Sequence, residues 1–162
     1  GHDLVARDLI KAGAAVNRAA KDGRMALMQA CQNDHEHVVC VLIEAGAAVN
    51  HSANDGVTAL MLACNNGHEH VARVLIKAQA DPNLTAVDPL AGPGWTALMY
   101  ACQNGFDRVA RIMIEMAADV NAANQQGSTA LMLCCGNGHQ GAARALIEAH
   151  NNTNTTNAAA NK

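Results

Sequence analysis

The sequence predicts an all-α repeat solenoid, in which short helical units stack in a row. First, four similar segments begin at Gly23, Gly56, Gly94 and Gly127, so their spacing is 33, 38 and 33 residues. Second, MALM or TALM follows each of these glycines at the same offset. Third, 50% of the residues are hydrophobic but only three are aromatic, which suits a thin core of small and aliphatic side chains. Repeats of this length bury their apolar faces against neighbouring repeats.

The elements of one unit can be read from residues 21–53. Apolar residues at helical spacing predict a first helix over about 25–32 and a second over about 36–45. Gly46 follows the second helix, at the place where a left-handed residue commonly ends a helix. Each unit therefore contributes two short helices that a tight turn connects.

Three residues predict differences between the helix ends. Thr58 supplies an N-cap hydroxyl to the first helix of its unit. Met25 replaces this threonine one unit earlier, so we expect the side-chain cap to be absent there. Gln79 replaces the glycine that ends the second helix, and we expect a less clean helix end at that point.

By this pattern residues 1–150 form one repeat domain. It contains a half repeat (1–20) and four complete repeats (21–53, 54–86, 94–126 and 127–150). An insertion loop (about 84–93) lies between the second and third complete repeats. The half repeat has only a second helix, so we expect one flank of its apolar stripe to be uncovered. Its start in mid-repeat suggests a piece of a longer array. The tail, residues 151–162, is biased to Asn, Thr and Ala, and we expect little order there.

The insertion follows Asn83 and makes one junction longer than the others. Pro89, Gly92 and Pro93 favour turns and argue against a continuous strand ladder, so we expect an enlarged loop that projects from the stack. All three aromatic residues of the chain lie in the repeat that follows this loop.

The repeated segments resemble ankyrin repeats. Four spaced features agree, namely the glycine before TALM, the Ala-Cys pair, the Gly-His turn and a closing A-x-V-N as in residues 47–50. The resemblance covers nearly everything from Gly1 to about His150. It implies units of a β-hairpin finger and two antiparallel helices, stacked with a concave face. Members of this family usually bind partner proteins through the finger tips and the inner helices.

One departure from the family pattern recurs in every complete repeat. Methionine stands where the family has histidine, at Met28, Met61, Met99 and Met132. In the family that histidine joins hydrogen bonds between helix and hairpin, so packing must replace them here. The methionines either fill the core at the repeat junctions or form an adaptable binding strip. Their spacing of one per repeat favours the core.

Cysteines occupy one position of four successive repeats, at Cys31, Cys64, Cys102 and Cys135. Like positions in stacked helices lie about 10 Å apart, whereas a disulfide needs Cα atoms within about 7 Å. We therefore expect small, buried, unpaired thiols. Free thiols at this density indicate a reducing compartment, and hence a cytoplasmic or nuclear protein.

Histidines recur at the turns between helices, as in His35 and His68. The resemblance implies that these rings cap the following helix and pack against it. His37 and His70 follow two residues later, and side chains at this spacing diverge on a helix, so a metal-binding pair is not indicated. No nucleophile or phosphate-binding motif occurs. We expect neither a cofactor nor catalytic activity.

Charge and hydropathy exclude two further classes of partner. The formal net charge of −3 lacks the basic surface that nucleic-acid binding requires. No run of about 18 apolar residues indicates a membrane span. We expect a monomeric module that binds a partner protein. The alternative is a structural or autoregulatory segment of a larger multidomain protein.

The family's contact positions map onto a weakly charged strip that is rich in side-chain amides. The predicted contacts are Arg24, Gln32, Asn33, Val57, Asn65, Asn66, Trp95, Gln103, Asn104, Gln125, Ser128 and Asn137. Trp95 is the predicted anchor, because tryptophan is the commonest hot-spot residue of interfaces. The alternative is that Trp95 folds back and covers the enlarged loop.

Two finger asparagines are candidates for modification. The resemblance implies that an asparaginyl hydroxylase can modify the asparagine after an Asp-Val pair, with a preference for leucine eight residues earlier. Asn121 has the Asp-Val pair but lacks the leucine, whereas Asn50 has Leu42 but lacks the acid. The alternative is that both asparagines satisfy local backbone groups.

Overall fold

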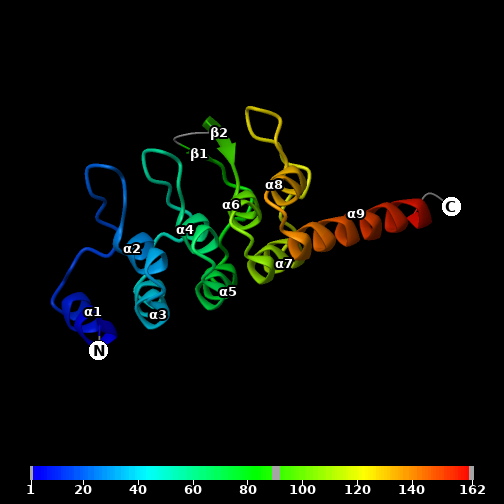
Figure 1. Cartoon of the computed structure of the whole chain (residues 1–162). Helices are drawn as coiled ribbons and strands as arrows, with labels where there is room; N and C mark the ends of the chain where they lie inside the picture. The colour runs from blue at the N-terminus through cyan, green and yellow to red at the C-terminus, as the bar shows by residue number, and fades with distance from the viewer. Residues whose placement is uncertain (1, 89–91, 161–162) are drawn as a thin grey trace.

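In the computed structural model the helices lie in two layers that run side by side along one axis (Figure 1). Residues 2–88 and 92–160 are described, with side chains up to Asn151. The inner layer contains α2 (Ala26–Gln32), α4 (Ala59–Asn65), α6 (Ala97–Gln103) and α8 (Ala130–Gly136). The outer layer contains α1 (His2–Lys11), α3 (Glu36–Glu44), α5 (Glu69–Lys77), α7 (Asp107–Glu115) and α9 (Gln140–Ala160). Each inner helix packs on the outer helix that follows it, which confirms the predicted solenoid.

The inner helices are short because only seven residues lie between the N-cap and the C-cap of each. The Met61 amide donates to the Thr58 hydroxyl at 3.3 Å, and Thr96 and Thr129 cap their helices in the same way. No side chain caps α2 at Met25, as the sequence predicted. Helices of this length are marginal on their own, so packing between the layers must hold them.

Methionines fill the core at the junctions between units. Met28, Met61 and Met99 are each 1% exposed, and they belong to one continuous apolar cluster. This burial supports the core interpretation over the binding strip for these three residues. Met132 differs, with 60% exposure, because α8 is the last inner helix of the described stack.

The repeated cysteines, like the methionines, are buried in every complete repeat except the last. Cys31, Cys64 and Cys102 are buried and unpaired, as expected. The prediction is wrong for Cys135, which is exposed. In an earlier repeat the same position contacts the next unit, as Cys64 contacts Met113, whereas among the described residues no further unit covers Cys135. Cys134, one residue earlier, is the buried thiol of α8.

Both ends of the stack expose apolar side chains. At the start, Leu4, Val5 and Leu9 of α1 are 57–62% exposed, which confirms the predicted uncovered flank. At the other end, Met132 and Ile147 are 60% and 50% exposed. In the middle units the corresponding surfaces are covered by neighbouring helices.

The fingers project from one edge of the stack (Figure 1). Neighbouring fingers are joined by backbone hydrogen bonds. The Val87 amide donates to the Asp55 carbonyl at 2.8 Å, and the Gln125 amide donates to the Pro93 carbonyl at 3.0 Å. The fingers approach closely enough to require glycine. At Gly56 the φ angle is 79°, and a Cβ atom would lie 2.9 Å from a backbone oxygen of the next finger.

The insertion extends one finger as a hairpin. Strands β1 (Ala86–Asp88) and β2 (Gly92–Trp95) pair in antiparallel fashion, with a register shift between Ala86 and Val87. The predicted loop is therefore wrong in part, because two strands do pair, although their ladder is irregular. Pro93 is tolerated because its nitrogen and its carbonyl point away from β1, so the ladder loses no N–H donor at this residue. The carbonyl accepts a hydrogen bond from the following finger. Pro89 lies outside the described residues.

Two outer helices end without the usual glycine. Gln79 and Ala117 adopt left-handed backbone conformations, with φ angles of 65° and 59°. The Gln79 amide still donates to the Ile76 carbonyl at 2.9 Å, as the Gly46 amide does to Ile43 at 3.0 Å. The predicted looser helix end at Gln79 is therefore wrong.

Helix α9 continues through most of the tail. Its backbone is helical to Ala160, whereas the sequence predicted little order in 151–162. No glycine or proline interrupts the chain after Gly141, so nothing in this segment forces the helix to stop. Residues 161 and 162 lie outside the described residues. Although α9 is long, no helix in the described parts of the chain is both long and apolar enough to cross a membrane.

Candidate protein-binding face

The predicted contact residues lie along the fingers and the inner helices, and together these form the inner face. The exposed ones are Gln32, Asn33, Asn65, Asn66, Asn104, Gln125 and Asn137. The half-buried ones are Arg24, Val57, Gln103 and Ser128. The inner face therefore brings eleven of the predicted residues to one accessible surface.

Trp95 is the exception, and its predicted exposure is wrong. Its side chain is only 4% exposed and belongs to the apolar cluster. Its backbone pairs with Ala86 of the insertion, and its ring contacts that of Tyr100 with centroids 5.1 Å apart. Among the described residues, its buried Nε1 group has no hydrogen-bond acceptor. Trp95 thus packs beneath the insertion, which was the alternative interpretation.

Four asparagines of the predicted strip also end the inner helices. Each side-chain amide donates to the carbonyl four residues earlier, at 2.8–3.0 Å, in Asn33, Asn66, Asn104 and Asn137. These bonds satisfy carbonyl groups that a helix end leaves without partners. The recurrence of asparagine at this position therefore has a structural cause, besides any contact with a partner.

Side chains of neighbouring units also hydrogen-bond along the strip. The Asn104 amide donates to the side chain and the carbonyl of Asn65 at 3.0 and 3.2 Å, and the Asn137 amide donates to Gln103 at 3.2 Å. These bonds hold part of the inner face in one arrangement. A partner would then meet a surface that is already ordered.

Two turn histidines, His68 and His139, hydrogen-bond to the preceding unit, and neither His35 nor His68 caps its own helix. The Nε2 group of His68 donates to the Gln32 carbonyl at 3.0 Å, while α5 has no side-chain cap. The implied capping role is therefore wrong. Phe106 stands at the position of His68 in the next repeat, and its side chain cannot donate a hydrogen bond. In that repeat Asn104 donates instead to the Asn65 carbonyl, which corresponds to the Gln32 carbonyl.

A cavity of about 220 Å³ opens on the inner face between three fingers. Its lining residues are Arg24, Asp55, Val57, Met61, Leu62, Asn65, Val87, Asp88 and Tyr100. Val87, Asp88 and Tyr100 were not among the contacts predicted from the repeat pattern. They belong to the insertion and to the aromatic group after it, where the repeat pattern breaks, and that break was the available signal.

Charges of both signs line this cavity. The Arg24 guanidinium lies 3.8 Å from carboxylate oxygens of Asp22 and Asp55, and it donates to Gln32 at 3.2 Å. Burial, with a smaller contribution from the carboxylates of Asp88 and Asp55, raises the pKa of Tyr100 to about 12. The tyrosine hydroxyl is therefore neutral at physiological pH and lies in a negative local field.

Asparagine side chains in the fingers join successive units by hydrogen bonds. Asn50 donates to the Gln79 carbonyl at 3.0 Å and accepts from the Asp81 amide at 2.8 Å. The Asn83 side chain likewise accepts from the following unit, at 2.8 Å. Asn121 holds the same position in the last complete finger, and in the described structure its side chain makes no such bond. The backbone groups that Asn50 satisfies thus belong to the next unit and not to its own turn.

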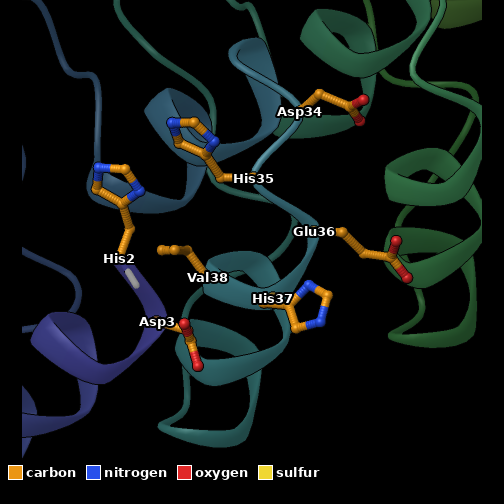
Figure 2. A pocket seen from close by; sticks show the side chains of 7 residues that line it. All are labelled: His2, Asp3, Asp34, His35, Glu36, His37 and Val38. Carbon is orange, nitrogen blue, oxygen red and sulfur yellow. The ribbon is translucent and has the colours of Figure 1, made fainter.

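A second cavity, of about 420 Å³, collects titratable side chains near the start of the chain (Figure 2). His2 and His35 stack with ring centroids 5.4 Å apart, whereas His37 points away from them (Figure 2). This confirms the predicted divergence of His35 and His37. In the described parts of the chain, no group of three or more His, Cys, Asp or Glu residues is placed to hold a metal ion.

The buried thiols are poor nucleophiles. Burial raises the pKa of Cys31 to about 12 and also raises that of Cys64, so both remain protonated at neutral pH. Their protonation and burial fit a packing role.

Comparison with known proteins agrees with the geometry. A family model for ankyrin repeats, described as three copies, matches residues 1–86 and 83–157. A search of curated proteins found no match. Ankyrin repeats form stacks of helix–turn–helix units with hairpin fingers, they are generally protein–protein interaction modules, and they are typically non-enzymatic. The matched regions cover nearly the whole chain, and this chain therefore belongs to the ankyrin repeat family.

Proposed function

We propose that this chain binds a partner protein through the inner face, with the finger tips and inner helices making the contacts. The observation that carries the proposal is the cavity between three fingers, which joins charged, amide and apolar groups in one accessible place. Interfaces of this kind place apolar contacts beside a polar rim.

The rest of the strip supports the same surface. Gln32, Asn65 and Gln125 expose side-chain amides, which can both donate and accept hydrogen bonds. The strip is weakly charged, so hydrogen-bond geometry would contribute more to recognition than long-range attraction. Trp95 is left out of the proposed contacts because it is buried.

A pair of variants tests this proposal. Val57→Arg places a long charged side chain on the inner face, where Val57 lines the cavity. His70→Arg adds the same group at an exposed position of α5, in the outer layer. Affinity capture from a cell extract, followed by titration of the captured protein, should show at least a tenfold loss of affinity for Val57→Arg only. Equal affinity of both variants would refute binding through the inner face. If wild type captures no partner, the alternative of a structural or autoregulatory segment is favoured.

We also propose Asn121, rather than Asn50, as the finger asparagine open to hydroxylation. Two hydrogen bonds to the following unit hold the Asn50 side chain, so a modifying enzyme could reach it only after local opening. Mass spectrometry after incubation with an asparaginyl hydroxylase should find added oxygen on the peptide of Asn121. Oxygen on the Asn50 peptide alone would contradict this preference.

A further inference from the structure

The cavity between the three fingers lies in the middle of the inner face, so its apolar lining is not explained by the uncovered ends of the stack. Most large exposed apolar side chains lie at those ends, where no neighbouring unit covers them. Val87 does not: it lies on β1, beside the cavity, and is 48% exposed. Val57 lies on the neighbouring finger and also lines the cavity. The cavity therefore offers apolar walls in the middle of the stack.

The charges around these walls favour a cation. Asp55 and Asp88 both line the cavity. Arg24 is the cationic group of the lining, but Asp22 and Asp55 lie 3.8 Å from its guanidinium and offset its charge. An entering carboxylate would meet two carboxylates, whereas an entering cation would be attracted by them.

Tyr100 provides an aromatic surface at the same place. The ring lines the cavity, and Trp95 holds it from the side of the core, at a centroid distance of 5.1 Å. Asp88 and Asp55 line the same cavity as this ring, and after burial they are the further causes that raise the pKa of its hydroxyl group. Aromatic rings attract cations, and the attraction increases where water is partly excluded.

We infer that the cavity receives a basic side chain, lysine or arginine, from the partner protein. The inference rests on the proposed function, because it names the chemistry of one contact on the same face. The aliphatic stem would pack against Val57 and Val87, as long basic side chains do on apolar surface. The charged end would lie beside Asp55, Asp88 and the ring of Tyr100.

Amide NMR spectra of the whole chain, titrated with small probes, test this inference. The probe is N-acetyl-arginine N-methylamide, and the matched controls carry norleucine or glutamate in place of arginine. We expect saturable shifts of the Val57, Val87 and Tyr100 amide signals with the arginine probe. The shifts with either control should be at least fivefold smaller. Equal shifts with a control, or no shift at the cavity, would overturn the inference.

Two aspartates of similar local structure supply the variants. The Asp55 side chain accepts from the Val57 amide at 3.0 Å, and the Asp81 side chain accepts from the Asn83 amide at 2.9 Å. Asparagine can keep either bond while it removes the charge. Asp55→Asn should weaken binding of the arginine probe at least threefold, and Asp81→Asn should leave it unchanged. Equal binding to both variants would overturn the inference.

The outcomes separate this inference from the proposed function. If Val57→Arg no longer binds the partner but the arginine probe does not bind in the cavity, the inference fails and the proposed function stands. If the probe binds but Val57→Arg keeps the partner, binding through the inner face is refuted, and with it the inference about the partner's side chain.

Discussion

Trp95 supports Tyr100 from beneath the inner face, with their ring centroids 5.1 Å apart and the rings inclined by 38°. Trp95 is buried, while Tyr100 is half-buried and lines the cavity. The insertion makes this arrangement, because its strand pairs with the backbone of Trp95. The longest finger of the stack thus positions the aromatic wall of the candidate binding site.

Trp95→Ala should reduce stability. The buried indole leaves a large void, and such a change typically costs about 3–5 kcal/mol of unfolding free energy. Trp95→Phe should lose less than half as much, because it keeps a ring against Tyr100 and removes a buried N–H group without an acceptor. Urea unfolding followed by circular dichroism measures both variants. An unchanged midpoint for Trp95→Ala would mean that the side chain is not packed as described.

Tyr100 should titrate near pH 12, above its ordinary pKa of 10.0. Burial and the nearby carboxylates favour the neutral hydroxyl in the folded state. This contribution to stability is therefore present below about pH 10 and is lost as the pH rises toward about 12. The chain has one tyrosine, so its ultraviolet absorbance on alkaline titration reports this group alone.

Asp88→Asn should lower the pKa of Tyr100 toward its ordinary value, because it removes one of the two named charges. Asp81→Asn is the matched control, since Asp81 is not among the causes of the shift. Identical titration curves for the two variants would show that Asp88 does not act on the hydroxyl group.

Asn50→Ala should destabilise the stack, and Asn121→Ala should not. Asn50 makes two hydrogen bonds to the next unit, each worth about 0.5–1.5 kcal/mol, so we expect a loss of about 1–2 kcal/mol. In the described structure the Asn121 side chain makes no such bond to the following unit, and its replacement should stay within about 0.5 kcal/mol. Equal losses of unfolding free energy in the two variants, measured by thermal unfolding, would contradict the role assigned to the Asn50 hydrogen bonds.

Ala117→Gly should stabilise the protein. Ala117 has a φ angle of 59°, a conformation that costs residues other than glycine about 1–2 kcal/mol. Glycine relieves most of this cost, so we expect a gain of about 1 kcal/mol. Ala45→Gly is the control: its φ angle is −85°, and glycine there should cost about 0.5–1 kcal/mol. A loss in both variants would argue against strain at Ala117.

The repeat pattern was enough to predict the helices and several of their ends. The glycine and TALM segments located the inner helices, and the threonine of TALM identified their caps because the hydroxyl acts within its own turn. The missing cap at Met25 followed from the same local rule. Interactions of this range depend on a few neighbouring residues, so one sequence can reveal them.

Contacts between units were harder to predict. The end of α5 at Gln79 is regular without glycine, and Asn50, 29 residues earlier, donates to the Gln79 carbonyl. Cys135 and Met132 are exposed because α8 is the last inner helix of the described stack, although their repeat positions predict burial. Trp95 lies in the core because of the insertion hairpin, where the prolines argued against a continuous strand ladder but two short strands pair. In each case the deciding partner lies in another unit or in the insertion.

Cross-saturation NMR of the complex with a captured partner tests the central claim most directly. The perdeuterated chain is observed through its amide signals while the aliphatic protons of the protonated partner are saturated. We predict attenuated signals along the fingers and the inner helices, including Val57, Asn65 and Val87, with unchanged signals on the exposed surface of α3, α5 and α7. Attenuation confined to that outer surface would contradict binding through the inner face.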